Sequence, residues 1–307
     1  MINRLPQPDR TYVTDAGLET EMVFLRKIDL PCFSSTTLLG HEEGRAALNE
    51  YFRDYLELAR AKEVGCILET PSWRASSDWA GQLGLSQEGL DDANREAVAI
   101  VRDIANDYPD VDALISGCIG PRGDGYDPGN AMTAADAHRY HNRQISVMAE
   151  ANVDLITAIT MTNIPEAIGI TLAAKAAGKP LVISFTLETD GNLPTGDALR
   201  DAIRAVDEAT GNYPAYFMIN CAHPTHFEHI LVGDADWIGR IGGLRANASC
   251  KSHAELEEME VLDDGDPEEL GRQYRALRER LPGLKVFGGC CGTDIRHVTA
   301  IADHCIA

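Results

Sequence analysis

The chain has 307 residues, 44% of them hydrophobic, and is therefore long enough to bury a large core. Its 48 acidic and 27 basic residues give a formal net charge of −21, which repels phosphate backbones and anionic membrane surfaces. The composition thus excludes nucleic acid and membranes as expected partners.

The sequence has no signal-peptide-like apolar stretch at its start and no apolar run of about 18 residues, the length that a membrane span requires. We expect a cytoplasmic protein whose eight cysteines are reduced thiols, because this compartment is reducing and the core needs no disulfide framework. The sequence gives no indication of oligomeric state.

Eight apolar runs of strand length alternate with stretches of helical periodicity, such as residues 43–63 and 134–151. The runs cover residues 12–15, 66–70, 113–118, 153–159, 181–186, 216–221, 237–244 and 285–289. This alternation predicts parallel strands, and eight repeats in one chain favour a (β/α)8 TIM barrel forming a single domain over residues 1–307. The seventh run is the least regular, because Gly242 and Gly243 interrupt it.

Chemistry in such barrels gathers where the strands end, on the loops that lead into the helices. Several chemically useful residues fall at these positions: Asp15, Thr70, Ser72, Gly120-Pro121-Arg122, Asn220-Cys221, Asn247 and Cys290-Cys291.

Cys290 and Cys291 follow the eighth run within a glycine-rich segment. Adjacent cysteines seldom form a disulfide with each other, so we expect both sulfurs to be free. Gly288, Gly289 and Gly292 provide the backbone freedom to aim both at one thiophilic ion, for which Zn²⁺ is the first choice. Cys221, which ends the sixth run on the same barrel face, is the expected third ligand.

The other cysteines are expected to be structural: Cys32, Cys66, Cys118, Cys250 and Cys305. His223, His226 and His229 form a competing metal motif, but Pro224 indicates that a helix begins here and directs the histidines away from the barrel mouth. A metallohydrolase would also carry a His-x-His pair after its first strand, which this chain lacks.

Residues 255–269 contain nine carboxylates together with Gly265 and Pro267. This acidic segment is interpreted as a solvated loop or helix start, and its position after the seventh strand also allows a lid over the site.

In chain order, several motifs resemble those of the homocysteine S-methyltransferase family over nearly the whole sequence. They are Asp15-Ala16-Gly17-Leu18-Glu19-Thr20-Glu21, Thr70-Pro71-Ser72-Trp73-Arg74-Ala75-Ser76, Ser116-Gly117-Cys118-Ile119-Gly120-Pro121, Ser184-Phe185-Thr186, Asn220-Cys221 and Gly288-Gly289-Cys290-Cys291-Gly292. The Asn-Cys and Gly-Gly-Cys-Cys-Gly pieces in this order are the most specific.

The resemblance implies a zinc-dependent thiol methyltransferase with Cys221, Cys290 and Cys291 as metal ligands. It also implies that Asp15 is the acidic residue that helps to hold the amino-acid substrate. We expect Glu21, Thr70, Ser72, Arg74 and Asn220 to complete the substrate-binding set. Three thiolates leave one tetrahedral position for a substrate thiol, which binds as a thiolate and is itself the nucleophile, so no separate protein base is assigned. The expected reaction moves a methyl group from S-methylmethionine or S-adenosylmethionine to homocysteine and forms methionine.

This chain departs from the family pattern near the substrate. Ile159-Thr160 stands where the family has Glu-Thr, so a carboxylate expected near the substrate ammonium is missing. Arg74 is equally compatible with binding a substrate carboxylate and with pairing to a neighbouring acidic residue. Two alternatives therefore stand beside homocysteine methylation: the same zinc-thiolate chemistry on another small thiol, and a non-catalytic zinc or redox protein.

Overall fold

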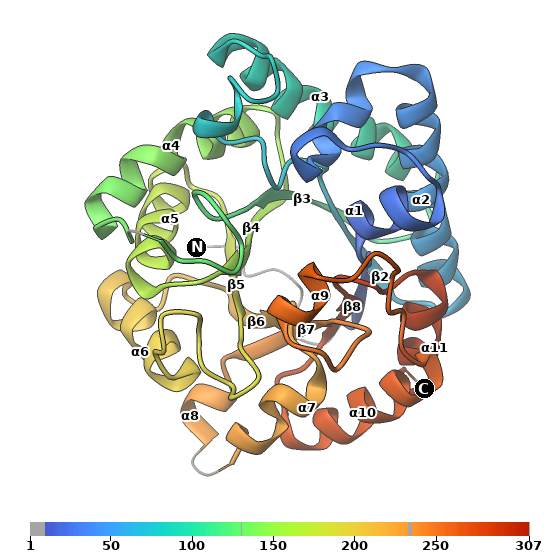
Figure 1. The fold of residues 1–307 in the computed structure, drawn as a ribbon, viewed down its shortest axis with the longest axis vertical. Coiled ribbons are helices and arrows are strands. Elements are labelled where there is room, and N and C mark those ends of the chain that lie inside the picture. Colours follow the sequence, from blue (N-terminus) through green and yellow to red (C-terminus); the bar gives the residue numbers. More distant parts are fainter. Residues whose placement is uncertain (1–9, 130, 233–234, 307) are drawn as a thin grey trace.

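A computed structural model describes residues 10–129, 131–232 and 235–306. Eight parallel strands pair in sequence order and close on themselves, with β1 bonded to both β2 and β8 (Figure 1). The strands are β1 (Tyr12–Thr14), β2 (Gly65–Glu69), β3 (Ala113–Ile119), β4 (Leu155–Met161), β5 (Leu181–Thr186), β6 (Tyr216–Asn220), β7 (Ile241–Ala246) and β8 (Val286–Gly289). The predicted (β/α)8 barrel is confirmed.

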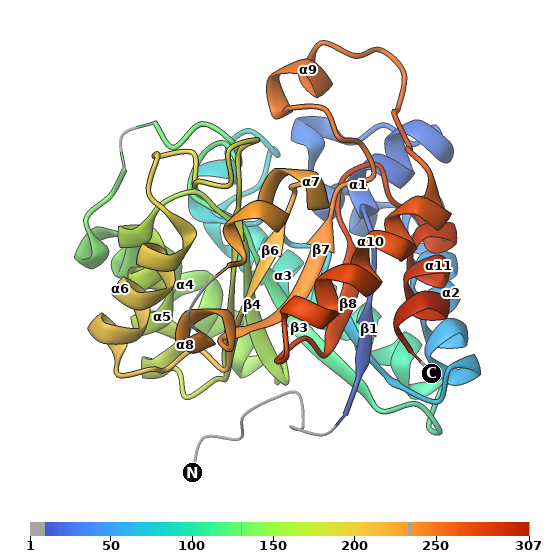
Figure 2. The ribbon, with the colours of Figure 1, turned by 90° about the horizontal axis from the view of Figure 1, so that it is seen from below.

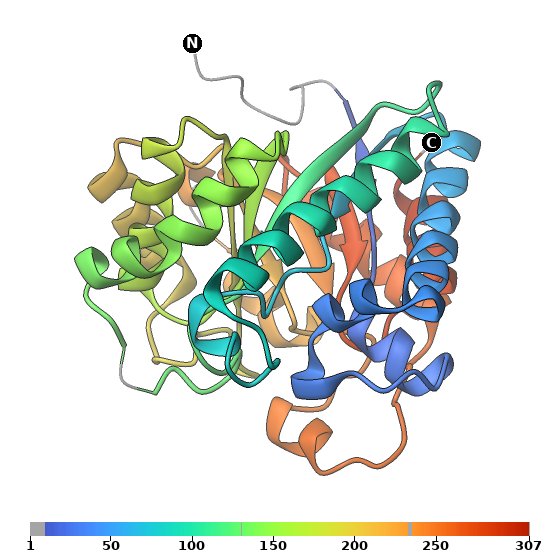
Figure 3. The ribbon, with the colours of Figure 1, turned by 90° about the horizontal axis from the view of Figure 1, so that it is seen from above.

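Helices surround the barrel, and α2 and α3 lie along the outside of the strands that they connect (Figure 3). They are α1 (Leu18–Thr20), α2 (Glu42–Ala61), α3 (Gln87–Asn106), α4 (Ala134–Glu150), α5 (Ile164–Ala176), α6 (Leu199–Thr210), α7 (Pro224–Phe227), α8 (Ala235–Ile238), α9 (His253–Glu257), α10 (Pro267–Arg280) and α11 (Ile295–Cys305). Ser86, Thr133 and Asn163 cap the starts of α3, α4 and α5 by accepting a backbone N–H. None of the helices in the described ranges is long and apolar enough to cross a bilayer.

The prediction for the seventh strand was wrong at its start. Trp237 and Ile238 belong to α8, where both are buried, and the strand begins only at Ile241. Gly243 lies inside the strand: a Cβ there would come within 2.7 Å of the Met218 sulfur. The glycine therefore allows β7 to pack closely on β6 instead of interrupting it.

The inward-facing side chains form two layers of opposite chemistry. The apolar layer, nearer the amino ends of the strands, contains Tyr12, Ile67, Leu114, Leu155, Val182, Tyr216, Met218 and Val286. Inward positions recur every second residue, so the next positions along these strands form a second layer. This polar layer consists of Thr14, Glu69, Ser116, Thr157, Ser184, Asn220 and Arg245, all buried.

The polar layer lies toward the face where the strands end. The loop that carries α9 projects from this same face of the barrel (Figure 2). Any site on this face is therefore built over a buried set of hydroxyls, amides and charges.

Candidate metal centre and substrate pocket

Three sulfur atoms converge at the carboxyl end of the barrel. The Sγ atoms of Cys221, Cys290 and Cys291 all lie within 4.8 Å of one another, and no other such group of metal-binding side chains occurs among the residues that the structure describes. Cys221 follows β6 and Cys290 follows β8, and each donates its backbone N–H to β7, at Arg245 O (3.2 Å) and Ala246 O (2.9 Å). The end of β7 thus brings the two flanking loops together.

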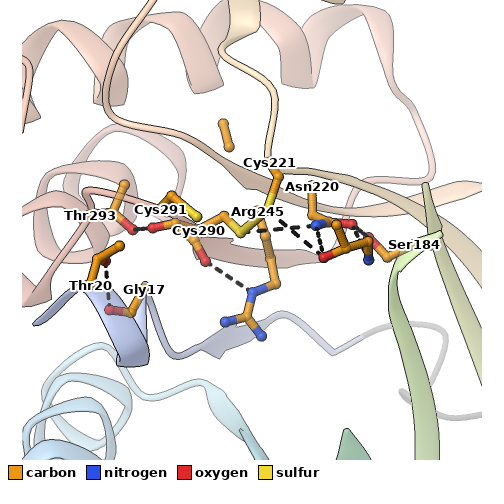
Figure 4. Close-up of a disulfide and its surroundings, with 12 residues drawn as sticks. Gly17, Thr20, Ser184, Asn220, Cys221, Arg245, Cys290, Cys291 and Thr293 are labelled. Carbon is orange, nitrogen blue, oxygen red and sulfur yellow. Dashed lines mark hydrogen bonds between the residues drawn. A yellow bond between two sulfur atoms is a disulfide. The ribbon is translucent and has the colours of Figure 1, made fainter. Parts of the chain in front are cut away.

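The expectation that both adjacent cysteines are free thiols is wrong for Cys290, which forms a disulfide with Cys221 (Figure 4). Cys291 is free, as expected. Adjacent cysteines do not pair with each other here, but the barrel brings Cys221 to Cys290 across β7. The disulfide and a three-thiolate metal site are alternative redox states of the same side chains, because both use the same sulfurs.

The turns that carry the sulfurs need unusual backbone conformations. Cys221 has φ +50°, in the left-handed region, and Gly292 follows Cys291 with φ +78°. Hydrogen bonds from the Cys221 N–H to Arg245 O and from the Asn247 N–H to Ala222 O tie this turn to the end of β7.

Each sulfur has one polar neighbour within the described structure. Asn220 Nδ2 lies 3.9 Å from Cys290 Sγ, Thr160 Oγ1 lies 3.9 Å from Cys221 Sγ, and the Tyr126 hydroxyl lies 3.4 Å from Cys291 Sγ. Burial raises the pKa of the Cys291 thiol, and the hydrogen bond from Tyr126 opposes this rise. Hydrogen bonds of this kind stabilise thiolates, the form in which cysteine binds a metal.

Asn220 is held rigidly beneath the sulfurs. Its Oδ1 accepts from the Ser184 hydroxyl at 2.6 Å and the Thr160 N–H at 3.0 Å, and its Nδ2 donates to Thr160 Oγ1 (Figure 4). The side chain is fully buried and positions Cys290 from below.

A cavity of about 420 Å³ opens beside the sulfurs, a size that suits a small-molecule ligand. Its floor includes Asp15, Glu69 and Arg245, and its walls include Thr70, Arg74 and Ile159. The loop after β7 forms another wall through Ser249, His253, Leu256, Met259, Val261 and Leu262.

The acidic segment 255–269 divides into the end of α9, a loop and the start of α10 at Pro267. Leu256, Met259 and Val261 line the pocket, and Val261 is 73% exposed. The carboxylate-rich stretch therefore also carries apolar side chains over the pocket mouth.

Charges on the pocket floor are arranged around Arg245. Its Nη1 lies 3.0 Å from Asp15 Oδ1 and 3.9 Å from Glu69 Oε1, while Nε and Nη2 donate to the carbonyls of Gly289 and Ala16. Burial disfavours the charged guanidinium, but the two carboxylates outweigh this effect and raise the pKa of Arg245. Burial raises the pKa of Glu69 to about 7.

Arg245 links the segment after β1 to the one that carries Cys290. Asp15, which it contacts, also accepts hydrogen bonds from the Thr14 and Tyr51 hydroxyls, at 2.9 and 3.3 Å. Both oxygens of the Asp15 carboxylate therefore have a partner within the chain, and Asp15 also lines the pocket.

Other residues of the predicted substrate-binding set lie in varied surroundings. Thr70 and Arg74 line the pocket, whereas Glu21 pairs with Arg26 at 2.9 Å and Ser72 is fully buried, with its Oγ donating to Cys118 O. The Arg74 guanidinium stacks on Trp73 and Trp79. It donates to Cys32 O at 2.7 Å and lies 3.6 Å from Asp124.

The three spaced histidines have other roles. His223 caps α7, which begins at Pro224 as predicted. His226 bonds to Cys250 O and His229 to Asp190 O, so both point away from the three sulfurs.

Sequence reasoning missed Glu69, Arg245, Tyr126 and His253 as pocket residues. Tyr126 stacks on His253 with ring centroids 3.9 Å apart. For Glu69 and Arg245 a signal existed: each is a charged residue at an inward position of an apolar strand.

Comparisons with known proteins agree on one family. The sequence profile described as "Homocysteine S-methyltransferase" matches residues 12–305. Homocysteine S-methyltransferase 1 of Brassica oleracea var. italica is 22% identical over 314 residues, covering 94% of this chain and 92% of the relative.

Betaine–homocysteine S-methyltransferase 1 of Danio rerio is 23% identical over 261 residues, which cover 77% of this chain and 60% of the relative. This chain thus spans under two thirds of the length of the zebrafish protein. The oxidized form of the homocysteine methyltransferase MmuM from Escherichia coli matches with a TM-score of 0.77 over 98% of both chains at 18% identity, which establishes the shared fold.

Proposed function

Because the chain belongs to the homocysteine S-methyltransferase family, we propose that it transfers a methyl group from S-methylmethionine or S-adenosylmethionine to homocysteine, forming methionine. The observation that carries this proposal is the convergence of three sulfurs on the wall of a pocket of about 420 Å³.

The residues present fit a zinc ion. Three cysteine sulfurs within 4.8 Å of one another are a soft donor set, and three protein ligands characterise catalytic zinc sites, which keep a fourth position for substrate. After reduction of the disulfide, Cys221, Cys290 and Cys291 would hold the ion. When bound, zinc lowers the pKa of a substrate thiol and keeps the sulfur nucleophilic.

The chain's own residues align the reactants. Asn220 fixes Cys290, and Arg245 ties the floor of the pocket to the strand end before Cys290, so the site is preorganised. Leu256 and Met259 cover the pocket with hydrocarbon and help to exclude water from the displacement at the methyl carbon. The methyl group moves to the acceptor sulfur, and the donor sulfur leaves with the bonding electron pair as a neutral thioether.

A second candidate reaction uses the same chemistry on a thiol without an amino group. Ile159 favours this candidate, because it lines the pocket with hydrocarbon at the position where the family has a carboxylate. The two candidates differ only in the acceptor.

The test is a methyl-transfer assay on reduced, zinc-loaded protein, read by mass spectrometry of the methylated thiol. L-homocysteine and a panel of other small thiols are each paired with S-methylmethionine, S-adenosylmethionine and betaine, with Cys290→Ala as the inactive control. Formation of methionine from either sulfonium donor is expected. Bound zinc without methylation of any thiol would contradict the proposal and favour a non-catalytic zinc protein.

A further inference from the structure

The Glu69 carboxyl group is buried on the pocket floor with one oxygen lacking a partner. Glu69 ends β2, is 5% exposed and lines the pocket beside the sulfurs. The Ser116 and Thr157 hydroxyls lie close enough to Glu69 to lower the pKa of its carboxyl group, but no described residue forms a hydrogen bond of good geometry with Oε2. Buried polar atoms are nearly always hydrogen-bonded, so an unpartnered carboxyl oxygen on a pocket wall indicates a ligand that supplies the donor.

The charge balance of the pocket floor points to a cation. Arg245 is one guanidinium shared by two carboxylates, and its closer contact is with Asp15, at 3.0 Å against 3.9 Å for Glu69. Its Nε and Nη2 atoms donate to backbone carbonyls, and Nη1 also donates to Thr14 Oγ1 at 3.3 Å. When Asp15 and Glu69 are both ionised, these two carboxylates and Arg245 therefore give the pocket floor a net charge of −1.

Neighbouring pocket residues do not supply this charge. Arg74 is engaged on the rim by Cys32 O and Asp124, and Glu19 adds a further carboxylate, bonded by the Ser35 hydroxyl at 2.7 Å. Burial raises the pKa of Glu69 to about 7, and the attraction of Arg245 at 3.9 Å opposes this rise only in part.

The type of cation follows from the hydrogen-bonding requirement. A sulfonium has no N–H group and would leave Oε2 without a donor, whereas a primary ammonium offers three donors and one positive charge. Ile159, two residues beyond Thr157 on the inward face of β4, presents only hydrocarbon to the pocket. An ammonium group in this pocket is therefore directed to the β2 side.

We propose that Glu69 binds the ammonium group of an amino-acid ligand, so that this pocket selects amino-acid thiols or amino-acid sulfonium donors over analogues that lack the amine. This inference rests on the proposed function and names the residue that sets its substrate class.

Calorimetric titration tests the proposal without catalysis. L-methionine and 4-(methylthio)butanoate differ only in the ammonium group, and the wild type is expected to bind methionine roughly 30-fold or more tightly. Glu69→Gln keeps the size of the side chain but removes the charge, so it should weaken methionine binding to the level of the des-amino compound and leave binding of that compound unchanged.

Two further variants separate recognition from folding. Glu69→Gln/Ile159→Glu places a carboxylate on the opposite wall and should restore part of the preference for methionine. Glu166→Gln changes a buried glutamate that bonds to His141 outside this pocket, so it should keep the full preference. Melting temperatures measured for all variants show that the folded protein is being titrated.

Kinetic measurements on pairs of substrates with and without the amine identify which ligand Glu69 binds. Homocysteine is compared with 4-mercaptobutanoate, and S-methylmethionine with its des-amino sulfonium analogue. A loss of discrimination in either pair on Glu69→Gln supports the proposal and identifies the ligand. Discrimination that survives Glu69→Gln, or an equal loss of binding for compounds with and without the amine, overturns it. If no thiol is methylated, the proposed function fails, while the titrations still decide the role of Glu69.

Discussion

Inside the barrel, the apolar layer and the polar layer are built by the same strands but hold different chemistry. Leu155 and Val182 in the apolar layer are completely buried among hydrocarbon. Two residues further along the same strands, Thr157 and Ser184 form hydrogen bonds, to Ser116 and Asn220. The comparison indicates a division of labour, in which the apolar layer stabilises the barrel and the polar layer positions the site above it.

Cys290→Ala is expected to have the largest effect on the site while leaving the fold intact. Removing one of three sulfurs should abolish stoichiometric zinc binding and methyl transfer, a greater loss than the roughly 10- to 100-fold effect of changes outside the ligand sphere. Far-UV circular dichroism should stay unchanged, because the barrel core does not include the metal. Zinc content is measured by atomic absorption.

Cys250→Ser serves as the matched control, since Cys250 is an exposed free cysteine. It should retain full zinc content. Unfolding of the Cys290→Ala protein would instead mean that the ion is structural.

Arg245→Met tests the polar layer. It leaves Asp15 and Glu69 buried without their shared cation, and breaking such a pair costs about 3 to 5 kcal/mol of the free energy of unfolding. Urea unfolding at pH 7.5 measures the loss, and adding Glu69→Gln to this variant should recover part of it. A loss under about 1 kcal/mol would show that solvent already screens these charges.

Leu155→Ala tests the apolar layer in the same assay. Deleting a fully buried leucine should cost about 2 to 4 kcal/mol. Zinc content and activity per folded molecule should remain at wild-type values, because Leu155 lies a layer below the site. Loss of zinc in this variant would contradict the division between the layers.

Changing the pH is expected to alter the free energy of unfolding by less than the two substitutions above. Burial raises the pKa of Glu69, which faces Arg245 and Asp15, from its ordinary value of 4.5 to about 7. Between these values the native state holds a proton that the unfolded state releases, so this group's contribution to stability falls as the pH rises through that window. The unfolding free energy of the wild type should therefore fall by about 1 to 3 kcal/mol relative to that of Glu69→Gln between pH 5 and pH 8. Parallel pH profiles for the two proteins would exclude this shift.

The sequence allowed the barrel and its three converging sulfurs to be predicted, because alternation and strand ends are local signals. Cys221 and Cys290 were brought together by the rule that strand ends share one face, but their disulfide depends on pairing across β7, which no local pattern contains. Glu69 and Arg245 each gave a local signal, a charge inside an apolar strand, but no local pattern contains their clustering with Asp15. Only the strand register reveals that a charge at the end of β7 lies beside charges that follow β1 and end β2.

X-ray absorption spectroscopy of the reduced, zinc-loaded protein most directly tests whether Cys221, Cys290 and Cys291 hold one ion with an exchangeable fourth position. Without substrate, we expect three sulfur neighbours at about 2.3 Å and one lighter atom. Addition of homocysteine should raise the number of sulfur neighbours to four. An unchanged spectrum, or a fourth protein ligand already present without substrate, would contradict a catalytic role for these three cysteines.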